Sequence, residues 1–143
     1  MLAIYDNFST GYKILGFLHI LSAVVAFGPL FIYPSMQRAG AGPEVARLHL
    51  RMSLPALVLT WVLGMGLVGM SKDAFEMSQT WIVLSLACWV ALVAVSWFLI
   101  RPSLGDGSES ARSKLAAGIG ATHLIVVVVI YLMVFKPGGP DGI

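Results

Sequence analysis

The chain has 143 residues, of which 58% are hydrophobic and only 11% are charged, and its formal net charge is +2. A water-soluble domain has about a quarter of its residues charged, because it must solvate its surface. The composition therefore excludes a soluble enzyme and a disordered chain, the single cysteine excludes an intrachain disulfide, and the small net charge argues against nucleic acid as a partner.

Charged residues divide the chain into long apolar windows. The windows without Asp, Glu, Lys or Arg contain 24, 20, 24 and 21 residues and cover 14–37, 52–71, 77–100 and 115–135. A helix needs about 20 residues to cross a hydrocarbon core of about 30 Å. The windows are continuous apolar runs, without the alternation of a membrane barrel strand. The sequence therefore predicts four transmembrane helices.

In chain order, we expect helices at about 12–34, 50–70, 79–101 and 113–136, in a single membrane domain over 1–143 that ends in a flexible tail at 137–143. Pro34 and Pro102 are expected to end the first and third helices, because proline has no amide hydrogen and crowds the preceding turn. Gly28 and Pro29 predict a kink in the first helix. The expected fold class is all-α: an integral membrane four-helix bundle built from two antiparallel hairpins.

The distribution of lysine and arginine predicts the orientation. With four crossings, the first and third loops share a side that carries six basic residues, and the other side carries three. Because basic loops stay in the cytoplasm, we expect both termini to be extracytoplasmic and the chain to lie in a bacterial-type inner (cytoplasmic) membrane. The lipid bilayer is then its first partner.

Small residues indicate how the helices pack, because membrane helices approach closely where side chains are small. The expected packing faces include Gly16, Ser22, Ala23 and Ala26 on helix one, and Ala116, Gly120 and Ala121 on helix four. We expect Cys88 to be an inert packing residue of helix three. Trp81 and Trp97 are expected to bracket that helix at the two membrane interfaces.

The three histidines are the candidate functional residues. His19 and His123 are predicted to point into the bundle, whereas His49, between Arg47 and Arg51, is expected at the solvated surface. Each inward histidine either donates an interhelical hydrogen bond or binds haem b as an iron ligand or a propionate partner. From the outer ends of their helices, His19 lies about 9 Å deep and His123 about 20 Å deep, so the two form a poor axial pair and His19 alone is the easier ligand.

The chain resembles a known group of membrane proteins. The run from His19 to Gly28 resembles the first helix of HemJ-type protoporphyrinogen oxidases and their copper-resistance-D relatives, and Ser53 to Ala56 with Thr60 and Gly64 is similar to that group's second helix. The ending Met133 to Pro137 is similar to the close of its fourth helix. The nearest resemblance is to an uncharacterised family of predicted four-helix integral membrane proteins in this neighbourhood.

The resemblance implies a four-helix fold in which His19 matches the haem-associated histidine of the HemJ first helix. Three other positions depart from the pattern. Ser85 stands where the HemJ group has a lysine, no histidine occurs over 95–97, and 118–121 replaces an asparagine-glutamate-proline run. Without these groups, oxidation of a porphyrinogen is not expected.

Three functions remain open at this point. The first is a non-catalytic accessory or assembly subunit that contacts other membrane subunits or forms a homo-oligomer. The second is a haem or porphyrin binder that uses His19, with His123 as a second candidate. The third is a transporter of a small solute or metal, although three separated histidines do not form a metal relay.

Overall fold

The computed structural model describes residues 9–72 and 74–139, and this part of the chain is helical without strands. Four helical rods in it are long and apolar enough to cross a membrane: Thr10–Arg38, Gly42–Gly69, Thr80–Ser103 and Glu109–Phe135. The expectation of an all-α fold with four helices of membrane-spanning length and composition is therefore confirmed. With about 1.5 Å per residue, rods of 24 to 29 residues are about 36 to 43 Å long.

The first three rods are each built from successive helical elements. The first contains α2 (Thr10–Phe27), the 3-10 helix η1 (Gly28–Phe31) and α3 (Tyr33–Arg38). The second contains α4 (Gly42–Leu48), the π-helix η2 (His49–Ser53) and α5 (Leu54–Gly69). The third contains α6 (Thr80–Val95), the π-helix η3 (Ser96–Ile100) and α7 (Arg101–Ser103), and the fourth is the single helix α8 (Glu109–Phe135).

Prolines account for the changes of helical pitch. Each π-helix ends two residues before a proline: η2 before Pro55 and η3 before Pro102. A proline ring crowds the carbonyl four residues earlier and gives it no hydrogen bond, and the wide turn of a π-helix accommodates that carbonyl. The expectation that Pro34 ends the first helix is wrong, because Pro34 lies in the first turn of α3, where an amide hydrogen is not needed, and the rod continues to Arg38. The third rod ends at Ser103, directly after Pro102, as expected.

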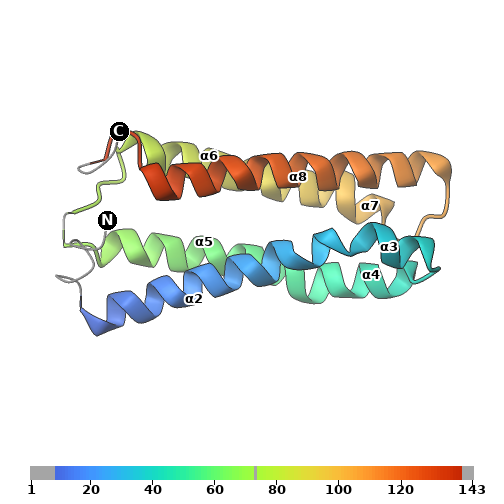
Figure 1. The fold of residues 1–143 in the computed structure, drawn as a ribbon, viewed down its shortest axis with the longest axis horizontal. Helices are drawn as coiled ribbons and strands as arrows, with labels where there is room; N and C mark the ends of the chain where they lie inside the picture. Colours follow the sequence, from blue (N-terminus) through green and yellow to red (C-terminus); the bar gives the residue numbers. More distant parts are fainter. Residues whose placement is uncertain (1–8, 73, 140–143) are drawn as a thin grey trace.

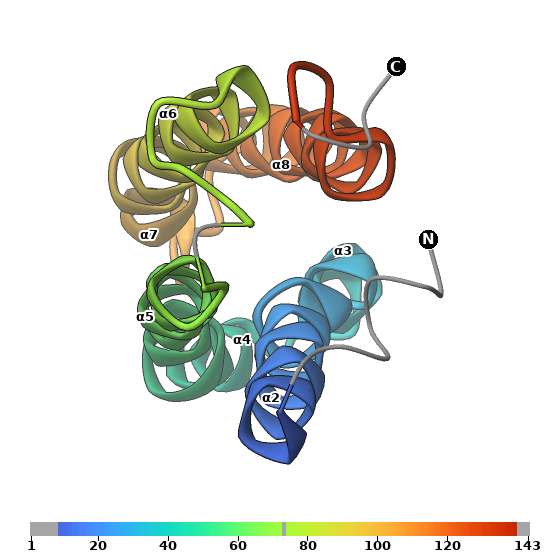
Figure 2. The same ribbon diagram turned by 90° about the vertical axis from the view of Figure 1, so that its left-hand side faces the viewer.

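The rods pack in sequential pairs. Helix α2 packs along α5, and α6 packs along α8. In Figure 1 the helices run along the bundle axis, with the pair α6 and α8 above the pair α2 and α5. Figure 2 shows the two pairs facing each other when viewed down that axis. The start of α2 and the end of α8 lie at one end of the bundle (Figure 1), which we call the distal end.

The opposite end of the bundle holds loop one (39–41) and loop three (104–108). Both loops reverse the chain at a glycine with φ of +82°, Gly40 and Gly105, a conformation that other residues adopt only with strain. Loop three also lies close to the start of α4, since a Cβ on Gly42 would lie 3.7 Å from the Cα of Gly105. We call this the basic end, because it carries Arg38, Arg47, Arg101 and Arg112.

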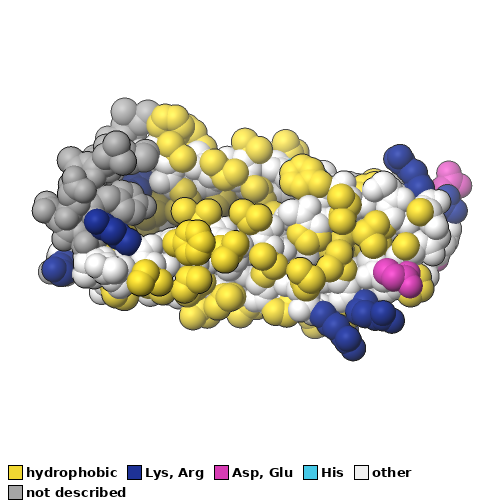
Figure 3. Space-filling model, turned by 60° about the horizontal axis from the view of Figure 1, so that its bottom comes forward, with side chains coloured by type: hydrophobic (Ala, Val, Ile, Leu, Met, Phe, Trp, Pro, Cys, Tyr) yellow, Lys and Arg dark blue, Asp and Glu magenta, His cyan; other side chains and the backbone are white. Residues whose placement is uncertain are grey.

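The buried core has three layers along the bundle. The distal layer contains Tyr12, Phe75, Trp81, Ile82 and Leu132. The middle layer contains Ala26, Ala56, Leu57 and Leu92, and the layer nearest the basic end contains Leu30, Tyr33, Val45, Ile100, Leu115 and Ile119. On the outside, hydrophobic side chains form a belt between the ends, where most charged side chains of this view lie (Figure 3).

Helix four packs with a different face from the expected one. Its buried positions include Ala111, Leu115, Gly118 and Thr122, whereas Ala116 and Gly120 are exposed. Gly118 is the point of close approach, because a Cβ there would lie 2.9 Å from Cγ1 of Ile100. The expectation that Ala116 and Gly120 face the bundle is therefore wrong.

Two further expectations, for Trp81 and for the C-terminal tail, concern the distal end. Trp81 is only 6% exposed and packs edge-on against Phe75, so it is a core residue and not an interfacial anchor. Of the expected tail, residues 140–143 lie outside the described part of the chain. Gly138 turns against the start of α6, where its Cβ position lies 3.0 Å from Oγ1 of Thr80.

Candidate functional site

A buried polar cluster joins the two helix pairs near the basic end. Nε2 of His49 lies 2.8 Å from Oγ of Ser96, and Nδ1 lies 3.4 Å from the Tyr33 hydroxyl. That hydroxyl lies 2.9 Å from Oγ of Ser53. A neutral imidazole with its hydrogen on Nε2 satisfies all three contacts, if Ser53 donates to Tyr33, Tyr33 to Nδ1, and Nε2 to Ser96.

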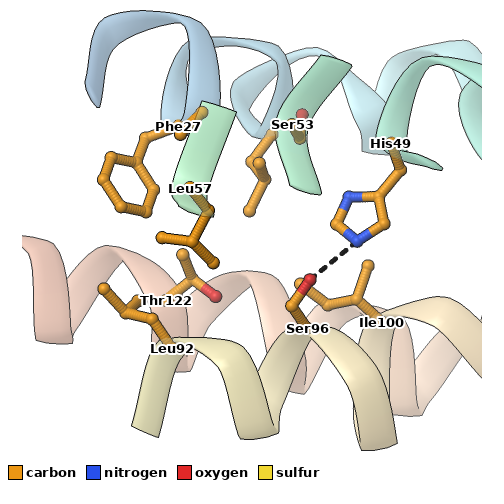
Figure 4. A pocket seen from close by; sticks show the side chains of 10 residues that line it. Phe27, His49, Ser53, Leu57, Leu92, Ser96, Ile100 and Thr122 are labelled. Carbon is orange, nitrogen blue, oxygen red and sulfur yellow. Dashed lines mark hydrogen bonds between the residues drawn. The ribbon is translucent and has the colours of Figure 1, made fainter. Parts of the chain in front are cut away.

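The π-helices place the two central residues of this cluster. His49 is the first residue of η2 and Ser96 is the first residue of η3. Each lies seven residues from the basic end of its rod, Gly42 or Ser103, which corresponds to about 10 Å of depth. Figure 4 shows the imidazole reaching from the first pair of helices to Ser96 on the second pair.

The burial of His49 corrects the sequence-based expectation. The residue is 2% exposed, not solvated at the surface. The reason is that the second rod begins at Gly42 and not near residue 50, so His49 lies about two turns inside the helix. A signal for the site was present in the sequence, because His49 and Ser96 each stand six residues before a proline.

A small cavity lies beside this cluster. It has a volume of about 20 Å³ and is lined by polar groups of His49, Ser53, Ser96 and Thr122 together with apolar side chains such as Leu57 and Leu92 (Figure 4). This volume is close to the minimum that holds one water molecule, about 10 to 15 Å³. The cavity is therefore sized for a single water, and a haem does not fit in it.

His19 makes the interhelical hydrogen bond expected of an inward histidine. Its Nδ1–H donates to the carbonyl of Thr60 at 2.8 Å, which leaves Nε2 as the acceptor nitrogen. The ring lies over Gly64, where an added Cβ would be 3.0 Å from Cε1 of His19. Glycine at position 64 therefore makes room for the imidazole between α2 and α5.

His123 lies elsewhere, in a different environment. Its ring stacks on Phe31 with the centroids 4.2 Å apart, and its Nε2 is buried without a hydrogen-bond partner in the described part of the chain. Phe31 is 12 residues beyond His19 on the first rod, which is about 18 Å along the helix. The structure thus does not bring His19 and His123 to a common site.

A cleft with a volume of about 850 Å³ lies at the basic end. Its walls come from α3 and loop one on one side, and from loop three and the first turns of α8 on the other. The charged residues that line it are Arg38, Asp106, Glu109 and Arg112. The sequence alone does not predict this cleft, because it depends on how loops one and three meet in space.

Comparison of the chain with protein-family models, with curated proteins and with solved structures gives no match. In the described part of the chain, no group of three or more His, Cys, Asp or Glu side chains is arranged to hold a metal ion. The polar cluster, the separate histidines and the cleft are therefore the features that bear on function.

Proposed function

We propose that this multi-pass membrane protein is an accessory or assembly subunit that acts by contact with other membrane proteins. The observation that carries the proposal is that polar side chains in the interior form hydrogen bonds to other helices of the same chain. His49 bonds to Ser96 between the helix pairs, and His19 bonds to Thr60 within the first pair. Trp89 also joins the pairs, since its Nε1–H donates to the Leu57 carbonyl at 3.0 Å.

Because these polar side chains are engaged inside the bundle, contacts with other proteins are made on its outer faces. One such face, which we call the α8 outer face, consists of Ala117, Gly120 and Leu124, all exposed. No heavy atom lies within 4 Å of a Cβ built on Gly120. Membrane helices associate over small residues, because their backbones then approach closely. A transmembrane helix of a partner subunit fits this face.

Site-specific photo-crosslinking tests this proposal. A photoreactive residue at Leu124 should crosslink to one membrane protein in native membranes, and the variant Gly120→Leu should abolish that product. Gly69→Leu is the matched control, because Gly69 is exposed and also has no neighbour within 4 Å of its Cβ position. A crosslink only to lipid, or a product unaffected by Gly120→Leu, would reject a partner helix at this face. A crosslink to a second copy of this chain would identify a homo-oligomer.

Haem binding through His19 is the second candidate function, and one observation favours it. Histidines that bind iron commonly donate the second ring hydrogen to a carbonyl, and Nδ1–H of His19 does so to Thr60. Nε2 is then the ligand atom. Neither cavity described above is lined by His19.

An absorbance spectrum of the purified protein decides between the two candidates. Haem binding predicts a Soret band after expression with haem supplied, and its loss in His19→Ala but not in His123→Ala. Absence of the band in the unmodified chain rejects haem binding and leaves the subunit proposal unchanged.

In either case, we propose that loops one and three face the cytoplasm and that both termini are extracytoplasmic, in a bacterial-type inner membrane. The support is the excess of lysine and arginine at the basic end, as basic loops resist translocation.

A further inference from the structure

The order of charges along the basic-end cleft suggests a ligand for it. Asp106 and Glu109 come first along the chain, Arg112 lies one turn further into α8, and Leu115, Ala116 and Ile119 follow. From residue 109 to residue 119 the helix rises about 15 Å, from the loop toward the middle of the membrane. Moving inward along α8, this wall of the cleft is therefore acidic, then basic, then apolar, whereas Arg38, the last residue of the first rod, lies at the outer end of the opposite wall.

A zwitterionic phospholipid has the same order of groups. Its ammonium group is outermost, its phosphate lies next, and its acyl chains lie deepest. The four charged side chains of the lining, Arg38, Asp106, Glu109 and Arg112, sum to zero, which favours a headgroup with both charges over a purely anionic one. Opposite charges that meet in this way fix the register of a ligand.

The arginines have donors to offer a phosphate. Nε and Nη2 of Arg112 donate to the carbonyl of Gly107 at 3.2 and 2.8 Å, which holds the guanidinium at the mouth of the cleft. An arginine has five N–H donors, so three of them are left for a ligand. Arg38, at the end of α3, is exposed on the opposite wall of the same cleft.

The acidic side chains suit a primary ammonium group. Asp106 is fully exposed, and its Oδ1 accepts the amide hydrogen of Ser108 at 2.8 Å. That bond lowers the pKa of Asp106 below its ordinary value, and the carboxylate is charged at neutral pH, as an ordinary aspartate also is. A primary ammonium has three N–H donors, whereas the quaternary ammonium of choline has none.

We propose that this cleft binds one phosphatidylethanolamine molecule, with its phosphate between Arg38 and Arg112 and its ammonium group at Asp106 and Glu109. The inner part of the cleft, at Leu115, Ala116 and Ile119, receives the beginning of an acyl chain. The site is separate from the α8 outer face, because neither Ala117 nor Gly120 lines the cleft.

Native mass spectrometry of the detergent-purified protein tests the proposal with phosphatidylethanolamine, phosphatidylcholine and phosphatidylglycerol as competing lipids of equal chain length. One phosphatidylethanolamine should be retained in preference to the other two. Arg112→Gln should weaken its retention about tenfold, as expected for the loss of charge-assisted hydrogen bonds. Arg47→Gln is the matched control, because Arg47 is exposed at the same end but does not line the cleft.

Two more variants separate a specific site from general attraction. Glu109→Gln should shift the preference toward phosphatidylglycerol, because the lining then becomes net positive. Ala116→Leu should displace the lipid by filling the cleft without altering a charge. Arg112 also holds loop three through its bonds to Gly107. The thermal unfolding of each variant is therefore first compared with that of the unmodified chain. Arg38→Gln then repeats the binding test without altering that loop.

Equal retention of the three lipids, or equal effects of Arg112→Gln and Arg47→Gln, would overturn the proposal. A preference for phosphatidylglycerol in the unmodified chain would also overturn it, in favour of an anionic lipid. None of these outcomes affects the proposal of a partner helix, which is tested at Gly120.

Discussion

His49 and Ser96 are 47 residues apart in the sequence, yet Nε2 of one lies 2.8 Å from Oγ of the other at the same depth of the bundle. Both side chains are buried. The contact joins the second and third rods, which belong to different helix pairs. It is therefore a polar link between the pairs, alongside the bond from Trp89 to the Leu57 carbonyl.

Removal of this link should destabilise the protein. Ser96→Ala leaves the buried Nε2 without its partner, and we expect a loss of about 1 to 2 kcal/mol in the free energy of unfolding. Ser103→Ala is the control, because Ser103 is equally buried but donates only to the Leu99 carbonyl of its own rod. Denaturation in mixed micelles, followed by far-ultraviolet circular dichroism, measures both. Equal losses for the two variants would show that the link between the pairs is not stabilising.

Close packing at Gly118 predicts a second pair of results. A Cβ at this position would lie 2.9 Å from Cγ1 and 3.7 Å from the amide nitrogen of Ile100. Gly118→Ala should therefore destabilise the bundle by about 1 to 3 kcal/mol through overpacking. Gly120→Ala, two residues away on the outer side, should be neutral or stabilise the helix by up to about 1 kcal/mol. The same unfolding assay compares them, and a tolerated alanine at 118 would contradict the packing of α8 on η3.

The sequence was sufficient to predict the number and type of the spanning helices, because a charge-free apolar window of about 20 residues has the length that a helix needs to cross the bilayer. It was not sufficient to predict which side of helix four is buried. Alanine and glycine are common on both sides of that helix, so residue type alone does not distinguish Gly118 from Gly120. The difference comes from Ile100 of the third rod, which lies beside Gly118.

The site was harder to predict, for a related reason. The sequence favours a surface position for His49, because arginines stand two residues away on either side. On a helix, however, residues two apart point in nearly opposite directions, so the arginines can face outward while the imidazole faces the core. The inward position of His19 was easier to predict, because helical periodicity places it on the small-residue face of the first helix. From that face its side chain reaches the second helix, where it forms a hydrogen bond.

Asp106 should titrate below its ordinary pKa of 3.8, chiefly because of the hydrogen bond from the Ser108 amide. A depressed folded-state pKa means that the carboxylate stabilises loop three above the unfolded pKa, and that this stabilisation disappears as the pH falls through the folded value. Carbon-13 NMR of the labelled aspartates would measure the titration directly.

Two variants of Ser108 separate the causes of that shift. Ser108→Pro removes both the amide hydrogen and the hydroxyl and should raise the pKa of Asp106 most, and the Ser108 φ of −64° is compatible with proline. Ser108→Ala keeps the amide hydrogen and removes only the hydroxyl, so its effect should be smaller. A shift in Ser108→Ala as large as that in Ser108→Pro would mean that the hydroxyl, and not the backbone, holds the carboxylate.

The proposed orientation predicts which loops a reagent can reach from outside the cell. In a Cys88→Ser background, a cysteine at Ser78 in the second loop should react with a membrane-impermeant maleimide in intact cells. A cysteine at Ser110, at the start of α8, should react only after permeabilisation. Both serines are exposed, so accessibility within the fold is matched. The reverse pattern would place the basic end outside, against the excess of arginine and lysine in loops one and three. It would also move the lipid cleft to the outer leaflet.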